Sequence, residues 1–143
     1  MTYNLGAVGF GHWFNRLYAG LRESNEFRIA KVVGVSDVSK KMEKLREIGL
    51  EEKDYYRVSD GKLPENFYSG LDLVHISDPN EYHAQQTIDS LKHGKFTVTE
   101  KTWCMHAEQR AIMDALKRNP EELPGSRIYF IRLAEDGSTD IFA

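Results

Sequence analysis

The chain has 143 residues, 41% of them hydrophobic, which is enough for one domain with a core and too few for two domains of ordinary size. Its 22 acidic and 19 basic residues give a net charge of -3 without a long run of one sign, which argues against nucleic acid or a membrane surface as a partner. No apolar stretch reaches the roughly 20 residues that span a bilayer and no signal-peptide pattern occurs, so we expect a cytoplasmic protein. Cys104 is the single cysteine, which excludes an intrachain disulfide and argues against a structural metal site.

The N-terminal third alternates apolar runs with segments of helical spacing. Residues 4–10 are typical of a strand, and residues 14–24 have their large apolar side chains at helical spacing. The continuous apolar run at 27–36 predicts a second strand that is covered on both faces. The charged segment 39–48 predicts an amphipathic helix, with Ser39 as its candidate N-cap.

The same alternation continues through the middle of the chain. Residues 55–58 predict a short edge strand, and residues 63–68 a short helix or turn. The strongest core strand is expected at 71–77, followed by a helix at 81–92 and a strand at 95–99. Strands that alternate with helices in this way indicate a parallel sheet.

The C-terminal part predicts a helix at 107–117 and a strand at 127–133, which we expect to complete the same sheet. The whole pattern predicts an α/β fold of the Rossmann type, with a doubly wound and mainly parallel sheet. Residues 1–133 are expected to form a dinucleotide-binding domain. Residues 134–143 form a short polar tail that we expect to be loosely ordered.

A glycine-containing turn lies between the first predicted strand and the first predicted helix. It reads Gly9, Phe10, Gly11, His12, Trp13 and Phe14. The two glycines match the first two positions of the G-x-G-x-x-G pattern, whose backbone approaches a pyrophosphate at a helix N-terminus. Phe14 occupies the third position, where a small residue normally allows close helix packing. Because Phe14 is large, either the predicted helix is displaced from the strand or the Phe14 ring turns into a neighbouring pocket. The alternative for the glycines is an ordinary strand-to-helix turn.

Asp37 directly follows the second predicted strand. A carboxylate at this point accepts hydrogen bonds from the ribose hydroxyls of a bound adenosine, and it repels a 2′-phosphate. The sequence therefore predicts NAD as the cofactor, with NADP the second choice because Lys40 and Lys41 lie nearby. The alternative is that Asp37 is an ordinary turn residue.

Two more loops are expected at the carboxyl ends of later strands, where ligands bind in open α/β sheets. They are Ser77–His83 and Thr99–Trp103. Together with the glycine turn, these motifs resemble the N-terminal domain of the glucose–fructose oxidoreductase, inositol dehydrogenase and rhizopine-catabolism (Gfo/Idh/MocA) family. The resemblance covers roughly Tyr3–Trp103. It implies an NAD(P)-dependent oxidoreductase that acts on a sugar-like or polyol alcohol or carbonyl.

The resemblance also implies roles for residues of the first loop. The family pattern there is Thr-Pro-Asn followed by His, and it lines the nicotinamide side of the cofactor pocket. Pro79, Asn80 and His83 match this pattern, whereas Asp78 replaces the threonine. Ser77 begins the loop and is counted with it as cofactor-binding. The alternative for His83 is a local packing or capping role.

The second loop of the family reads Glu-Lys-Pro, and its lysine points into the active site. Glu100 and Lys101 match, which implies a cofactor-binding role for Glu100 and a catalytic role for Lys101. Thr102 replaces the proline, so the backbone here lacks the residue that most readily adopts a cis peptide bond. The alternative for Lys101 is a solvated surface lysine.

Family members continue into a second domain that forms much of the substrate pocket and supplies a histidine acid/base. No residue of this chain matches that histidine, so we expect the chain to bind cofactor without completing an active site. An uncovered sheet edge or apolar face then predicts a homodimer. Two alternatives remain open: a non-catalytic nucleotide-sensing or protein-interaction module, and a Rossmann domain for CoA or another small molecule.

Overall fold

In the computed structural model of the protein, the described residues are 1–100, 114, 130–133 and 139–142. Most of the helix predicted at 107–117 lies outside them, as does the predicted catalytic residue Lys101. None of the helices in the described part of the chain is long and apolar enough to span a bilayer.

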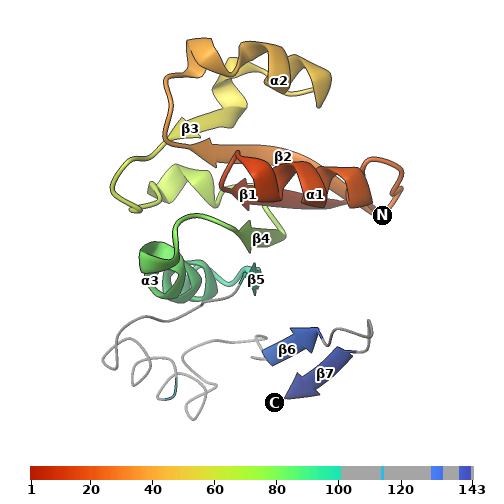
Figure 1. The fold of residues 1–143 in the computed structure, drawn as a ribbon, viewed down its shortest axis with the longest axis vertical. Coiled ribbons are helices and arrows are strands. Elements are labelled where there is room, and N and C mark those ends of the chain that lie inside the picture. The colour runs from red at the N-terminus through yellow and green to blue at the C-terminus, as the bar shows by residue number, and fades with distance from the viewer. Residues whose placement is uncertain (101–113, 115–129, 134–138, 143) are drawn as a thin grey trace.

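A sheet of five parallel strands is the centre of the fold (Figure 1). Its strand order is β3-β2-β1-β4-β5, the arrangement expected of a Rossmann-type fold, so this prediction is confirmed. The strands are β1 (Tyr3–Val8), β2 (Phe27–Gly34), β3 (Tyr55–Arg57), β4 (Leu73–Ile76) and β5 (Phe96–Thr99). Because β1 pairs with both β2 and β4, the chain changes direction across the sheet next to β1.

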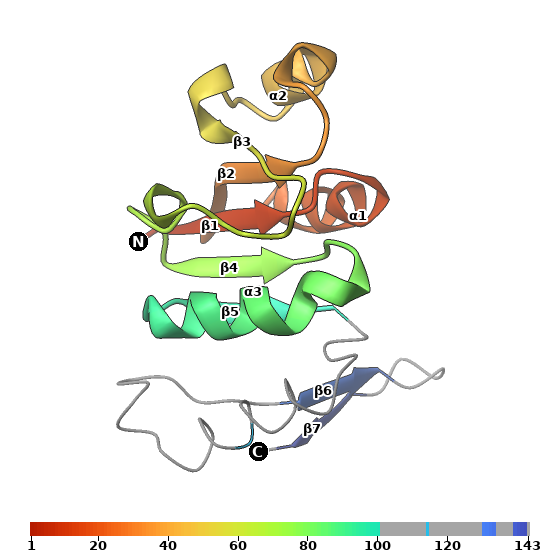
Figure 2. The same cartoon turned by 90° about the vertical axis from the view of Figure 1, so that its left-hand side faces the viewer.

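Within residues 1–100, three α-helices and three short 3-10 helices connect the strands. They are α1 (His12–Leu21), η1 (Val38–Lys40), α2 (Met42–Glu47), η2 (Glu52–Asp54), η3 (Glu65–Phe67) and α3 (Asn80–Lys92). Figure 2 shows α3 running alongside β4 and β5, with α1 beside the other half of the sheet.

The core has two layers because alternate side chains of a strand point to opposite faces of the sheet. In β1, Leu5 and Ala7 belong to a cluster with α1 and α2, whereas Val8 belongs to a cluster with Phe67 of η3. A ring stack between Tyr68 and His93, with centroids 3.9 Å apart, joins the end of α3 to the second layer. Helices therefore cover both faces, as a doubly wound sheet requires.

Two predicted helices differ from the observed ones by more than a one-residue shift. The first begins at His12 rather than Phe14, because Gly11 already serves as its N-cap residue. The segment predicted as one helix at 39–48 consists of η1 followed by α2. The predicted N-cap Ser39 is also wrong: Asp37 caps η1 by accepting a hydrogen bond from the Ser39 backbone N–H.

The last strands differ more strongly from the prediction. β6 (Phe130–Leu133) pairs antiparallel with β7 (Thr139–Phe142) in a separate two-stranded sheet. The expectation that the strand at 127–133 completes the five-stranded sheet is therefore wrong. Residues 139–142 of the predicted tail form β7, and the division of the chain at residue 133 stays a prediction. Antiparallel pairing with a neighbour close in sequence satisfies the backbone groups of both strands locally.

Candidate functional site

Most of the predicted site residues lie at one edge of the sheet. Because the strands are parallel, the segments that follow β1, β2, β4 and β5 all leave from the same edge. Backbone contacts tie these segments together: Gly9 N–H donates to Val33 O (3.0 Å), and Ser77 N–H donates to Val8 O (2.8 Å). The turn at Gly9–Gly11, Asp37 and the loop that begins at Ser77 therefore share one edge.

Gly9 is required by both its backbone conformation and its neighbours. Its φ angle is +104°, a value that residues with a side chain rarely adopt. A Cβ atom here would lie 2.7 Å from Ser77 Oγ and 3.0 Å from the Ser77 carbonyl carbon. β1 consequently ends at Val8, two residues earlier than predicted, and the chain turns sharply against the loop after β4.

Gly11, unlike Gly9, has open space where a side chain would lie. A Cβ atom at this position would meet no heavy atom within 4 Å, so the backbone here is open to an approaching group. Gly11 is the N-cap residue of α1, and among the described residues no side chain caps this helix end. The unpaired N–H groups and the partial positive charge of a helix N-terminus suit a phosphate.

The ring of Phe14 turns into the core between α1 and α2. It is 1% exposed and meets Phe10 edge to face, with ring centroids 4.7 Å apart. Lys44 from α2 covers both rings, and its Nζ donates to Phe10 O across 3.0 Å. Burial, with the nearby Lys41 as a second cause, holds the pKa of Lys44 below its usual value. Since the Phe10 side chain is buried, this residue presents only its backbone to the site.

His12 and Trp13 are exposed in the first turn of α1. Trp13 is 48% exposed; its ring meets the His12 ring edge to face, and the Arg16 guanidinium lies over it at 5.1 Å from the ring centroid. Both side chains therefore lie at the surface beside the glycine turn.

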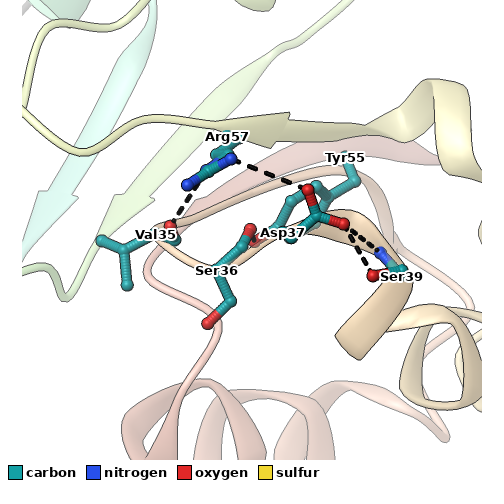
Figure 3. Close-up of polar contacts among 6 residues, drawn as sticks. All are labelled: Val35, Ser36, Asp37, Ser39, Tyr55 and Arg57. Carbon is teal, nitrogen blue, oxygen red and sulfur yellow. Dashed lines mark hydrogen bonds and ion pairs between the residues drawn. The ribbon is translucent and has the colours of Figure 1, made fainter.

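β2 ends at Gly34, two residues earlier than predicted, and Asp37 lies in the segment that follows it. The Asp37 carboxylate already has two partners (Figure 3). Oδ1 accepts hydrogen bonds from Ser39 N–H (3.0 Å) and Ser39 Oγ–H (2.7 Å), and Oδ2 lies 3.7 Å from Arg57 Nη1. The Ser39 hydrogen bonds, followed by the charges of Arg57 and Lys40, hold the pKa of Asp37 below its usual value. The side chain is ionised at neutral pH and 54% exposed, so it can accept hydrogen bonds from a bound ligand.

Strand β3 holds the Asp37 segment in place. The Tyr55 hydroxyl donates to Ser36 O (2.8 Å). Arg57 Nε–H donates to Val35 O (3.4 Å), as Figure 3 shows. The sequence predicts β3 as an edge strand, but it gives no sign that Tyr55 and Arg57 contact the Asp37 segment. The observed register, in which Gly34 pairs with Arg57, is what brings them to Asp37.

The loop after β4 is organised around a partly buried carboxylate. Asp78 Oδ2 accepts a hydrogen bond from Gln86 Nε2 (2.8 Å), and the same nitrogen donates to Gly61 O (3.1 Å). Burial raises the pKa of Asp78, and the Gln86 hydrogen bond partly offsets this rise. Ser77 Oγ–H donates to Val8 O (3.2 Å), which attaches the loop to β1.

His83 lies beneath this loop rather than on it. It is 1% exposed, and its Nε2 atom contacts the carbonyl oxygen of Asp78. Pro79 and Asn80, by contrast, are exposed at the start of α3. The structure thus places two of the motif residues where a ligand can reach them and the third in a supporting position. A direct contact between His83 and cofactor stays a prediction.

Glu100 follows β5, and its backbone N–H continues the β4–β5 ladder by donating to Ile76 O (2.9 Å). Its Oε1 atom lies 3.3 Å from Nε2 of His75, a residue of β4 that is 8% exposed. Burial lowers the pKa of His75, whereas the Glu100 carboxylate acts in the opposite direction. Sequence reasoning missed His75 because it lies within an apolar strand run.

Solved structures with similar folds exist, although neither a protein-family model nor a curated protein matches the sequence. An NAD-binding protein from Listeria innocua has a TM-score of 0.60 and 26% identity, with 82% of this chain covered. A scyllo-inositol dehydrogenase from Lactobacillus casei, solved with NAD(H) and scyllo-inositol, has a TM-score of 0.69, 18% identity and 86% coverage. A variant 3-ketoreductase from Actinomadura kijaniata, solved with TDP-benzene and NADP, has a TM-score of 0.64, 15% identity and 83% coverage.

The structural neighbours of this chain are oxidoreductases of the Gfo/Idh/MocA type. The resemblance predicted from the glycine turn and the two loops is thereby confirmed. The chain spans about a third of the length of these Gfo/Idh/MocA-type structures: 33%, 35% and 36% for the three described above. The match covers the N-terminal part of those proteins.

Proposed function

We propose that this chain is the nicotinamide-dinucleotide-binding domain of an oxidoreductase that acts on a sugar-like or polyol alcohol or carbonyl. The observation that carries the proposal is the meeting of the Gly9–Gly11 turn, Asp37 and the Ser77 loop at one edge of a parallel sheet. In open α/β sheets, dinucleotides bind at such an edge, where the order of the strands reverses. The substrate class follows from the likeness to Gfo/Idh/MocA-type structures and rests on their activity.

Each predicted residue has a proposed part in holding the cofactor. The backbone of Gly9, Phe10 and Gly11, with the N-terminus of α1, binds the pyrophosphate, and the open side of Gly11 gives the room for it. His12 and Trp13 border this turn. Asp37 accepts hydrogen bonds from the adenosine ribose, to which it offers an exposed and ionised carboxylate.

The nicotinamide side is proposed to lie along the segments that follow β4 and β5. Ser77, Pro79 and Asn80 border it directly, and His83 supports the loop through the Asp78 carbonyl oxygen. Glu100 lies beside these residues at the end of β5 and is held by His75. Lys101, next in the chain, is proposed to polarise the substrate oxygen while the bound cofactor supplies the hydride chemistry.

The ribose end favours NAD over NADP in this proposal. Asp37 is ionised, and a 2′-phosphate placed beside its carboxylate meets a charge of the same sign. The dinucleotide-binding domain is proposed to extend over residues 1–133. Activity on a substrate is proposed only for an assembly that supplies the substrate-binding part, because this chain corresponds to about a third of its structural neighbours.

Calorimetric titration of the full chain with NAD+, NADH and NADP+ tests the proposal. We expect saturable binding, and we expect Asp37→Ala to weaken NAD+ binding by about tenfold, since hydrogen bonds to a charged group are worth about 1.5–3 kcal/mol. Glu23→Ala is the control, because it removes the same charge between α1 and β2, at the opposite edge of the sheet. A folded protein that binds none of the three dinucleotides would contradict the proposed function.

We also propose that the chain forms a homodimer through the β5 side of the sheet. β5 is an edge strand of the five-stranded sheet, and its Phe96 and Val98 side chains are 63% and 38% exposed. They border a cavity of about 640 Å³ whose lining also includes Tyr3 and Phe27. Light scattering over a range of concentrations should detect a dimer that Phe96→Ser weakens and Trp13→Ser does not. A monomer at all concentrations would contradict it.

A further inference from the structure

We propose that Arg57 allows the ribose end of the site to accept a 2′-phosphate, so that the chain binds NADP(H) in addition to NAD(H). The inference rests on the proposed function and goes further, because it assigns a specificity role to a residue outside every motif in the sequence. It starts from an arrangement that Figure 3 shows: Arg57 of β3 points toward Asp37, which follows β2.

The position of Arg57 is set by the sheet and by one side-chain contact. Gly34, the last residue of β2, pairs with Arg57 in the parallel register. The Arg57 Nε–H donates to Val35 O, which directs the rest of the guanidinium group along the segment that leads to Asp37. Arg57 therefore reaches the end of β2 from the neighbouring strand rather than from the loop that carries the acid.

The guanidinium group keeps donors available for a ligand. Arginine has five N–H donors arranged as a planar fork. In the described part of the chain, Arg57 has two side-chain partners: Nε contacts Val35 O, and Nη1 lies 3.7 Å from Asp37 Oδ2. Nη2 has no hydrogen-bond partner among the described residues, and the side chain is 62% exposed. A phosphate at the 2′ position can thus be met without breaking a buried contact.

The Asp37–Arg57 pair is also easy to rearrange. Both side chains are more than half exposed, and the closest N–O distance of 3.7 Å exceeds that of a hydrogen bond. Exposed pairs of this kind contribute little to stability, so this one is separated at low cost. A phosphate carries more charge than a carboxylate and fits the arginine fork in a bidentate way, so it can compete for Arg57.

The local charge favours the same conclusion. Arg57 and Lys40 both act on the Asp37 carboxylate, so two cations offset the charge of one acid. The Asp37 Oδ1 atom is moreover engaged by Ser39 N–H and Ser39 Oγ–H. Its charge is therefore partly neutralised within the protein, and its repulsion of a 2′-phosphate is correspondingly reduced.

The test compares ligands that differ only at the 2′ position. Adenosine 2′,5′-bisphosphate and 5′-AMP compete with NADH for the full chain, and NADP+ and NAD+ are titrated directly. The variants are Arg57→Gln, which removes the charge, and Arg57→Lys, which keeps the charge without the fork. Arg22→Gln is the control, because Arg22 is an exposed arginine after α1 at the other end of the sheet. Circular dichroism verifies that each variant is folded.

We expect Arg57→Gln to weaken NADP+ and the bisphosphate by about five- to tenfold, with NAD+ and 5′-AMP changed less than about twofold. Arg57→Lys should give a smaller loss of NADP+ binding, and Arg22→Gln none. Binding of NAD+ without NADP+, or equal effects of Arg57→Gln on both, would overturn the role of Arg57 and leave the proposed function standing. A folded chain that binds neither dinucleotide would overturn both.

Discussion

The Tyr55 hydroxyl donates to the carbonyl oxygen of Ser36 across 2.8 Å, and this bond joins edge strand β3 to the segment that carries Asp37. The contact depends on Gly34, because a Cβ atom there would lie 2.4 Å from the Tyr55 hydroxyl oxygen. An edge strand of three residues thus positions the proposed ribose-binding acid.

Tyr55→Phe should therefore weaken cofactor binding as well as stability. Loss of one partly buried hydrogen bond predicts a decrease of about 1 kcal/mol in the free energy of unfolding. NAD+ affinity should also fall, because the Ser36 backbone loses its link to β3. Tyr56→Phe is a matched control, since its hydroxyl makes only a 3.5 Å contact with Asn66 O. Urea denaturation and calorimetry measure both effects, and equal results for the two variants would contradict this role of Tyr55.

Gly9→Ala should abolish dinucleotide binding and destabilise the protein by about 1–3 kcal/mol, the usual range for a non-glycine residue in a strained backbone conformation. The physical reason is the φ angle of +104° together with the approach to Ser77. Gly20→Ala is the control: it lies within α1 with open space around it, so it should stabilise the protein by about 0.5–1 kcal/mol. A Gly9→Ala protein that binds NAD+ normally would show that the turn does not need glycine.

Asp78→Asn should stabilise the protein at neutral pH. Burial raises the pKa of Asp78, so the native state binds this proton more tightly than the unfolded chain does. Stability then falls as the pH rises from the unfolded pKa of about 3.9 through the raised native pKa, and the loss persists at pH 7. Asparagine avoids this loss and still accepts the Gln86 hydrogen bond through its Oδ1 atom.

The difference between Asp78→Asn and the wild type should be largest near pH 7 and disappear at low pH, as measured by thermal unfolding over a pH series. We expect a gain of about 1 kcal/mol or less, because the carboxylate is partly exposed. Lower stability of the variant at pH 7 would mean that the charge of Asp78 is needed by the loop.

The contribution of His75 to stability should depend on pH in the opposite direction to that of Asp78. Burial lowers the pKa of this imidazole, so the unfolded chain binds the proton more tightly. The stability it contributes is complete above the unfolded pKa of about 6.5 and is lost as the pH falls below that value. His75→Leu should therefore lose less stability than the wild type between pH 7.5 and 5.5.

His93 provides an internal comparison for the His75 experiment. Its Nε2 atom lies 2.7 Å from Glu65 Oε2, and this hydrogen bond raises the pKa of His93. Its contribution is present below the unfolded pKa and is lost as the pH rises through the native pKa. His93→Gln should make the loss of stability at acid pH steeper, so parallel pH profiles for the two variants would contradict both assignments.

Local patterns in the sequence were sufficient for the central elements. The apolar runs around Val8 and Val74 predict buried strands, and the Gly9–Gly11 spacing predicts the turn between a strand and a helix. The apolar run that ends before Asp37 likewise predicts that this acid follows a strand. These features depend on residues that are close in sequence, where periodicity and backbone preference decide the structure.

The contacts that complete the candidate site depend on tertiary structure. Arg57 meets Asp37 across 20 positions, and His75 meets Glu100 across 25, because strand register brings them together. The β6–β7 pair could not be predicted because residues 139–142 lie in a polar segment without a clear period, and the apolar run at 127–133 predicts a strand but not the strand with which it pairs. The sequence by itself thus determined the order of the elements and the motifs at their ends, whereas side-chain neighbours were decided by pairing between distant segments, which no local pattern encodes.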